Sequence, residues 1–325
     1  MNNRRESRAI FFILIAVFAY SALPVLGAFS LETLDPTVFV AKSFFQYSLL
    51  QAAAWLVFRF FFDKEVRVPP VELPQSGKTY GLLALAGILI ASSYTCLFTS
   101  FHFINKAGAS VLYETWPIFV TIGLPLFFKQ RFERLDTADV VYILSAFIGV
   151  VMIINGSGGT EPTDQPSLDG EAGEITGLVL ATSSGITMAA AVIIKTHLMK
   201  TLTLNRAAIP VVAFVESSHR LAGAVALLLF GIATTDVSLD NLLRIDVSTA
   251  FALLELLGAS AFWYAIIATR RSTINVLWYL TPVLAVIWLS LLGLAQINLA
   301  IVAGAALIIA ANIMASRRQL TDAMG

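Results

Sequence analysis

A short stretch of the chain, VLYETWPIF at residues 111–119, places chemically active groups inside an otherwise apolar segment. Glu114 carries a carboxylate, and Tyr113 and Trp116 carry aromatic rings on either side of it. A carboxylate beside aromatic faces can bind a cationic group. Pro117 cannot donate a backbone hydrogen bond and clashes with the carbonyl four residues earlier, so it frees the carbonyl of Tyr113. These residues predict a binding site beside a hinge.

The same pattern returns at residues 276–284, VLWYLTPVL, where Pro282 lies 165 residues after the first proline. Pro282 frees the carbonyl of Trp278 in the same way, and Tyr279 stands where the first copy has its acid. Free backbone groups are tolerated at membrane depth only where protein or water satisfies them. We interpret the two prolines as hinges beside aromatic walls, with a plain kink in each helix as the alternative. A carboxylate in only one copy fits a substrate with one ionic end.

A second group of ionisable residues also lies within an apolar segment. Glu216 and Arg220 are four residues apart with the acid N-terminal, which is the better orientation for a pair on one helix face, and His219 is three residues from the acid. Ionisable side chains in membrane spans are rare and usually face an aqueous path or a partner. Two interpretations stay open, a substrate site and a buried structural ion pair.

Lys42, Glu114 and Glu255 share a depth in the predicted helices, about six to eight residues or ~9–12 Å below the outer surface. Lys42 and Gln46 are one turn apart and give their helix a polar face. This spacing permits a contact between Lys42 and Glu114. For Glu255, a protonated acid bonded to a neighbouring helix is the alternative to a binding role. The predicted binding residues are Lys42, Tyr113, Glu114, Trp116, Glu216, His219, Arg220, Glu255, Trp278 and Tyr279, and the predicted hinges are Pro117 and Pro282.

The composition points to a bilayer rather than water. With 58% hydrophobic and 13% charged residues and a mean hydropathy of +0.81, the chain has too little polar surface for a soluble fold of 325 residues. Basic and acidic residues balance at 21 each, and no basic stripe with interleaved aromatics occurs, so no nucleic-acid partner is expected. The single cysteine, Cys96, excludes an internal disulfide and a cysteine metal site. No metal or other cofactor is expected.

Ten runs of mainly apolar residues have about the 20-residue length that crosses the hydrocarbon. The predicted membrane helices are residues 8–29, 36–60, 79–100, 107–128, 138–156, 174–196, 207–233, 247–269, 272–294 and 297–315. The first run follows Arg4, Arg5 and Arg8, but its apolar core is longer than that of a signal peptide, so we interpret it as a helix. The sequence thus predicts an all-α integral membrane protein.

Lys and Arg residues collect on one side of these predicted helices. With a cytoplasmic N-terminus, 17 of the 21 fall in inside segments, and only Lys106 and Arg244 fall outside. Cytoplasmic loops are enriched in Lys and Arg, so both termini are predicted to be cytoplasmic in a bacterial inner or plasma membrane. The acidic, Gly-rich segment 156–173 contains neither residue type and is predicted to lie outside.

The segment 156–173 divides the chain into two five-helix halves, residues 1–155 and 174–325. Because five is odd, the two halves enter the membrane in opposite directions. This is the inverted repeat of many secondary transporters, whose binding site lies near the midplane between the halves.

Three blocks of the first half resemble the EamA type of the drug/metabolite transporter superfamily. They are PIFV from Pro117, FFKQRFERL from Phe127 to Leu135, and AFIGVVMI, which contains Gly149. The resemblance covers the whole chain and implies that the first four helices of each half surround a central cavity while the fifth braces the outside. The second half departs from the pattern, since Gln296 stands where an acidic residue is usual.

These features predict a secondary transporter that moves a small polar or zwitterionic, amino-acid-like metabolite by alternating access, with export favoured. Two cations and three acids within the spans suit a zwitterion better than a phosphorylated sugar, which would call for more Lys and Arg. The alternative substrate is an organic cation or quaternary ammonium compound held by Glu114 and the aromatic rings. An intramembrane enzyme and a channel are less favoured, because catalytic spacings and a continuous polar lining are missing. A coupled proton, and a monomer or homodimer, stay open.

The charge bias generates a labelling prediction. In a Cys96→Ala background, single cysteines at Ser157 or Gly170 should react with a membrane-impermeant thiol reagent added outside intact cells. Cysteines at Ser76 or Gln319 should be protected, because the inside segments carry the Lys and Arg excess. Outside labelling at Gln319 would contradict both the cytoplasmic termini and the ten-helix count.

Overall fold

The computed structural model consists of helices joined by turns, with no strand among the residues that it describes. These are residues 2–62, 76–116, 118–120, 123, 141, 144–145, 148–149, 151–152, 170–203, 208–234, 242–268, 277–278 and 280–322. The principal helices are α1 (Asn2–Ser30), α2 (Pro36–Phe62), α3 (Gly77–Ser100), α4 (Lys106–Tyr113), α7 (Gly170–Thr203), α8 (Ala208–Thr234), α10 (Val247–Ala268), α12 (Thr281–Leu291) and α13 (Leu299–Asp322). The predicted all-α class is confirmed.

Within the described ranges, five helices are long and apolar enough to cross a membrane by length and composition. They are Ser7–Ser30, Gly77–Ser100, Ala172–Met199, Val212–Phe230 and Val247–Ala265. Thr281–Leu291 and Leu299–Ala311 are shorter apolar helices. Most of the predicted fifth span, 138–156, and residues 156–169 of the predicted loop lie outside the described residues. The count of ten therefore stays a prediction, and residues 170–173, expected in the loop, already belong to α7.

Asp and Asn side chains cap several helix starts. The Asp35 carboxylate accepts from the backbone N–H of Thr37 at 2.8 Å at the start of α2, and Asp246 accepts from Ser248 at 2.9 Å at the start of α10. Asn105 does the same for α4, with 2.9 Å to the N–H of Ala107. Such caps satisfy backbone donors that have no partner within the helix. The sequence thus fixes these helix starts locally.

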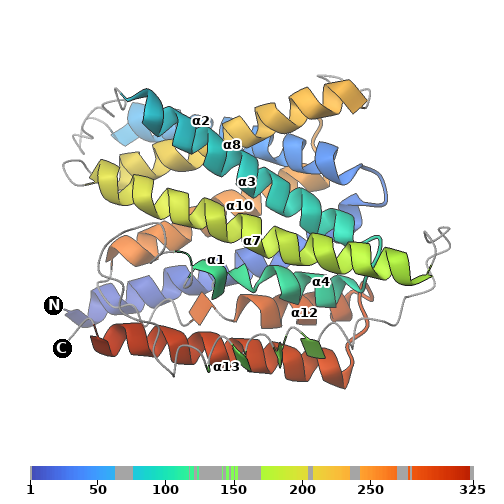
Figure 1. The fold of residues 1–325 in the computed structure, drawn as a ribbon. Helices are drawn as coiled ribbons and strands as arrows, with labels where there is room; N and C mark the ends of the chain where they lie inside the picture. Colours follow the sequence, from blue (N-terminus) through green and yellow to red (C-terminus); the bar gives the residue numbers. More distant parts are fainter. Residues whose placement is uncertain are drawn as a thin grey trace.

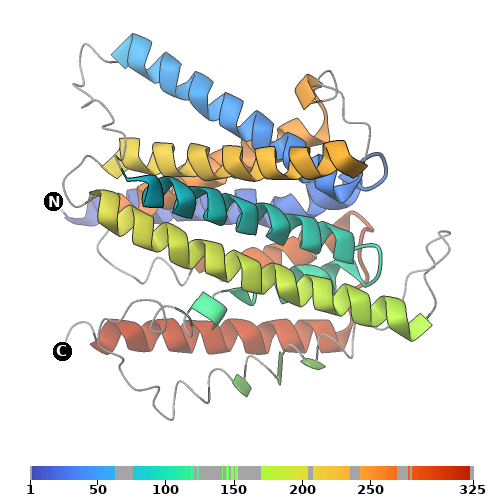
Figure 2. The same ribbon diagram turned by 45° about the horizontal axis from the view of Figure 1, so that its top comes forward.

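The helices of the two halves are interleaved. α1 packs most extensively along α10, α3 packs along α7, and α8 lies against both α2 and α3. Figure 1 shows the helices side by side, with α1 beginning and α13 ending at the same end of the bundle. Figure 2 shows α13 along one edge of the molecule. The centre of the bundle is therefore enclosed by helices from both halves.

The predicted hinge region of the first half interrupts its helix. α4 ends at Tyr113, and the next two residues, Glu114 and Thr115, form a turn before helical structure resumes at Trp116. The N–H of Thr115 bonds to the carbonyl of Leu112 at 3.1 Å, which is a tighter turn than the α-helix makes. The carboxylate is thus presented from a break in the helix.

The matching stretch of the second half is also interrupted. Leu277 and Trp278 are helical, Leu280 forms a turn, and α12 begins at Thr281. Pro282 lies in the first turn of α12, where its missing N–H removes no helical bond. Pro282 therefore begins a new helix rather than kinking a continuous one. Two further predictions, the hinge at Pro117 and the ring of Tyr279, lie outside the described residues.

α3 and α8 approach each other closely at two glycines. A Cβ added to Gly87 of α3 would clash with the backbone oxygen of His219, and one added to Gly223 of α8 would lie 2.6 Å from the backbone oxygen of Gly87. Small residues permit such close contact between membrane helices. This contact fixes the depth and rotation of the α8 turn that carries the ionisable residues.

The close contact at Gly87 predicts that replacing glycine by alanine at two positions of α3 has opposite effects on thermal stability. Gly87→Ala should lower the midpoint of thermal unfolding in detergent, because the new methyl group meets the backbone of α8. Gly81→Ala is the matched control: a Cβ at Gly81 meets nothing within 4 Å, and alanine favours a helix over glycine by roughly 1 kcal/mol. Equal midpoints for the two variants would contradict the close contact.

Candidate functional site

A cavity of about 410 Å³ lies between helices of both halves, within the size range of small-molecule pockets. α1, α3, α4, α7, α8 and α10 contribute to its wall. The lining is mainly apolar and aromatic, with four ionisable groups that are acids or strong bases. The lining residues are Tyr20, Leu23, Pro24, Ile90, Tyr94, Leu97, Tyr113, Glu114, Trp116, Met188, Val192, Lys195, Thr196, Met199, Arg220, Glu255, Phe262, Trp263 and Trp278.

Arg220 of α8 has partners on three helices. Its Nη2 donates to Oε1 of Glu255 on α10 at 2.8 Å, and its Nη1 bonds to Glu216 one turn earlier on α8. The guanidinium carbon lies 4.2 Å from the ring centroid of Tyr47 on α2. Arg220 is only 2% exposed, and a buried ion that loses its partner destabilises a protein by about 3–5 kcal/mol. These contacts therefore fix α8 against α10 and α2.

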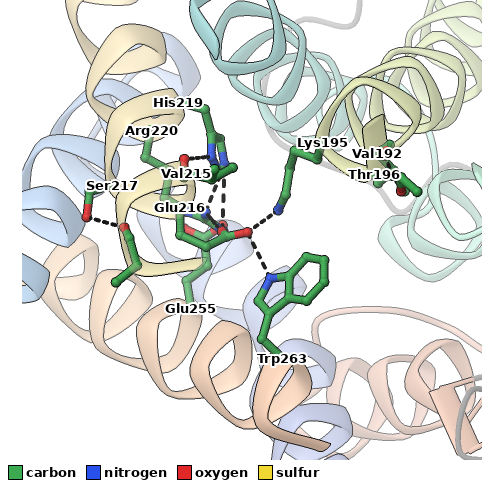
Figure 3. A network of polar contacts seen from close by, with 11 residues as sticks. Val192, Lys195, Thr196, Val215, Glu216, Ser217, His219, Arg220, Glu255 and Trp263 are labelled. Carbon is green, nitrogen blue, oxygen red and sulfur yellow. Dashed lines mark hydrogen bonds and ion pairs between the residues drawn. The ribbon is translucent and has the colours of Figure 1, made fainter. Parts of the chain in front are cut away.

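Glu216 gathers donors from three helices, as Figure 3 shows. Besides Arg220, it forms an ion pair with Lys195 of α7 and accepts a hydrogen bond from Nε1 of Trp263 on α10 at 2.9 Å. Glu216 is 1% exposed and does not belong to the cavity wall, whereas Lys195 and Arg220 do. The two cations therefore face the cavity with their shared acid behind them.

His219 supports this arrangement from within α8. Its Nδ1 lies 2.6 Å from the carbonyl oxygen of Val215, and its Nε2 lies 2.9 Å from Nη1 of Arg220. A carbonyl can only accept, so Nδ1 donates and Nε2 accepts from the guanidinium, which is the bonding pattern of a neutral imidazole. His219 is fully buried and does not line the cavity. Its contacts are those of a residue that positions Arg220.

Glu114 lines another part of the cavity wall, from the turn that follows α4. No lysine, arginine or histidine among the described residues forms an ion pair with it. Tyr113 and Trp116 line the cavity next to it, and the Trp116 ring centroid lies 6.5 Å from that of Trp278. The aromatic residues predicted from the two matched stretches therefore meet across the two halves.

Lys42 does not pair with Glu114, the contact that the sequence spacing permitted. Its Nζ lies 2.5 Å from the Asp246 carboxylate just before α10, and Lys42 is absent from the cavity wall. The long side chain reaches toward the end of the bundle, where the helix-capping acid supplies a partner. The neighbouring Gln46 extends this contact, since its Oε1 accepts from Ser248 at 3.1 Å. Lys42 thus joins α2 to α10 away from the cavity.

The acid of this outlying pair is stabilised in its ionised form. Partial burial raises the pKa of Asp246, but the hydrogen bonds donated by Lys42 and Ser248 outweigh it, and the net pKa lies below its usual value. A carboxyl whose pKa is lower in the folded state stabilises the fold above its unfolded pKa. The pair therefore holds at neutral pH and weakens only as the pH falls through the lowered pKa.

Two apolar clusters lie among the helices that form the site. In the first, the rings of Phe39, Phe98 and Phe251 pack edge to face, with centroids 5.2–5.9 Å apart. We call the second cluster the apolar plug, and its member Met199 also lines the cavity. Its buried members are Leu83, Leu198, Met199, Leu202 and Val215.

Lys195 lines the cavity but is not among the binding residues predicted from the sequence. It lies at the end of the predicted span 174–196 and is one of the 17 Lys and Arg residues expected inside, of which 16 remain without it. α7 continues to Thr203, so Lys195 lies eight residues inside the helix. The apolar Leu198, Met199 and Leu202 that follow it were the available signal. Tyr20 and Trp263 carried no sequence signal, because only packing brings them to the cavity.

Comparison with known proteins gives a family and a fold. The family model described as the EamA-like transporter family matches residues 7–155. No protein with a curated description matches the chain. One similar solved structure, titled "Crystal structure of protein", has a TM-score of 0.59 and 18% sequence identity, and covers 97% of this chain and 97% of that chain. At that identity the likeness concerns the fold alone, over nearly the full length.

The family match and the apolar helices agree on an integral membrane protein. Residues 7–155 therefore match the EamA-like transporter family, which is part of the drug/metabolite transporter superfamily.

Proposed function

We propose that this protein is a secondary transporter that carries a small zwitterionic metabolite, such as an amino acid, by alternating access. The main support for this proposal is that side chains of opposite charge line one cavity. Lys195 and Arg220 line it from α7 and α8, and Glu114 lines it from the end of α4. A carboxylate can dock on the two cations by charge-assisted hydrogen bonds, and an ammonium group can dock on Glu114.

Unsatisfied polar atoms in the cavity wall support a ligand with both donors and acceptors. Nε of Arg220, Nε1 of Trp278 and Oε2 of Glu255 are buried and have no hydrogen-bond partner among the described residues. Buried polar groups normally have hydrogen-bond partners, because a buried group without one costs about 1–3 kcal/mol of stability. A substrate carboxylate would satisfy the two donors, and a substrate ammonium would satisfy the acceptor.

An organic cation is the second candidate, and the surroundings of Glu114 favour it. The carboxylate has no cationic partner among the residues described, and the rings of Tyr113, Trp116 and Trp278 line the same cavity. Aromatic faces attract quaternary ammonium groups. We rank this candidate lower because it assigns no role to the two cations that face the cavity.

Alternating access draws support from the packing of the two halves. α1, the first helix of residues 1–155, packs on α10, and α7, the first helix of residues 174–325, packs on α3. Two five-helix halves in opposite orientations would exchange partners in this way around a site near the midplane. We accordingly propose ten membrane helices, cytoplasmic termini in a bacterial inner or plasma membrane, hinges at Pro117 and Pro282, and export as the direction.

The substrate class is tested by counterflow in proteoliposomes. Vesicles loaded with an unlabelled amino acid should take up the same radiolabelled amino acid, whereas the decarboxylated amine and the N-acetyl derivative should exchange at least tenfold more slowly. Glu114→Gln should lower amino-acid exchange at least tenfold with little loss of folded protein, because no ion pair to a described residue is broken.

The matched control is Glu32→Gln, which neutralises an exposed acid in the turn between α1 and α2 and should leave exchange unchanged. Exchange of amines without exchange of amino acids would favour the cation candidate instead. Exchange that is insensitive to Glu114→Gln would remove this acid from the substrate site.

A charge exchange tests whether the Glu216–Arg220 pair is an isolated structural pair. In the double variant Glu216→Arg with Arg220→Glu, the new cation faces Lys195 and the new acid faces Glu255, so like charges meet at both positions. The double variant should therefore give as little folded protein as either single variant, since each leaves buried charge uncompensated at a cost of about 3–5 kcal/mol. Size-exclusion profiles in detergent would show this, and recovery of folded protein in the double variant would contradict a network of Lys195, Glu216, Arg220 and Glu255.

A further inference from the structure

The two cations that face the cavity are held very differently. The side chain of Arg220 is 3% exposed, and it is bonded to acids on its own helix and on α10. The side chain of Lys195 is 13% exposed, and Glu216 on α8 is the acid with which it pairs among the described residues. Lys195 is therefore the cation that can change its partner.

Glu216 stays satisfied when Lys195 leaves. Its Oε2 retains the ion pair with Arg220, and its Oε1 retains the hydrogen bond from Nε1 of Trp263 at 2.9 Å. After the release, Arg220 faces two acids, Glu216 and Glu255, so one negative charge stays in excess near the released ammonium group. Glu216 therefore keeps a bonded partner at each oxygen, and the released ammonium group needs another anion.

The Lys195–Glu216 ion pair also joins α7 to α8, and we call it the ionic tie. Next to it, these helices meet through the apolar plug, which includes Leu198 and Met199 of α7 and Val215 of α8. Apolar contacts between membrane helices gain little over contacts with lipid, because both are apolar. The ion pair therefore adds a specific bond between α7 and α8 at the wall of the cavity.

We propose that Lys195 is a substrate-sensing residue that exchanges Glu216 for the carboxylate of a bound zwitterion and so releases α7 from α8. This inference rests on the proposed function, since it requires a carboxylate in the cavity. A ligand shifts a conformational equilibrium only by its difference in affinity for the two states. A substrate carboxylate that bonds to Lys195 only when the Lys195–Glu216 ion pair is broken supplies that difference in affinity.

Binding measurements test the exchange of partners. The probes are threonine, leucine, methionine and phenylalanine, each compared with its amide, which lacks the carboxylate charge. Trp116, Trp263 and Trp278 line the cavity, so intrinsic fluorescence can report binding. The wild type should bind the amino acids at least tenfold more tightly than the amides. Lys195→Met should reduce this preference to less than threefold without weakening the amides, and Lys195→Arg should preserve it.

Thiol reactivity tests the tie in the absence of substrate. A Met188→Cys change in a Cys96→Ala background places a thiol in the cavity wall, two helical turns from Lys195. Its reaction with N-ethylmaleimide, a neutral reagent, should become at least fivefold faster with Lys195→Met, whereas Lys195→Arg should stay within twofold of the parent. If Lys195→Met only destabilised the fold, the yield of folded protein would fall in both experiments. The preference for amino acids over their amides would then not be lost selectively.

The outcomes separate this inference from the proposed function. A wild type that binds none of the four amino acids overturns the amino-acid assignment and the partner exchange with it. A wild type that binds them, together with a Lys195→Met variant that keeps the full preference or the slow maleimide reaction, overturns the role of Lys195 alone.

Discussion

Burial of the Arg220 guanidinium is the constraint on which the centre of the bundle depends. An arginine cannot shed its charge in a protein interior, so its surroundings must supply acids and ring faces. Glu216, Glu255 and Tyr47 do so from α8, α10 and α2. Those three helices must therefore meet at one depth, and the close contact of Gly87 with α8 brings α3 to the same place. The cavity follows from this crossing.

Two ion pairs that join helices differ in their relation to the cavity. The Lys42–Asp246 pair lies beside three packed aromatic rings, and its lysine does not line the cavity. The Lys195–Glu216 pair lies beside the apolar plug, and its lysine does line the cavity. A ligand in the cavity can therefore contact Lys195 directly but not Lys42.

The broken helix after α4 illustrates how irregular backbone is accommodated inside the membrane. A Cβ at Gly185 of α7 would lie 3.1 Å from the Tyr113 carbonyl oxygen, so the glycine lets α7 cover the break closely. Protein thus shields backbone groups that lipid could not satisfy. The turn that results presents Glu114 to the cavity, and the same break carries both this candidate site residue and the proposed hinge.

The sequence by itself determined the helical class, the positions of five apolar spans and the local pair of Glu216 and Arg220, because apolar run length and helical spacing are local properties. It also predicted that Glu114, Trp116 and Trp278 gather at one site, from the matched prolines. Only the tertiary structure decided which distant partner each charge takes. Lys42 found Asp246, and Lys195 joined the cavity, because side-chain reach and helix crossing, which are properties of the packed bundle, choose among acids that the sequence leaves equivalent.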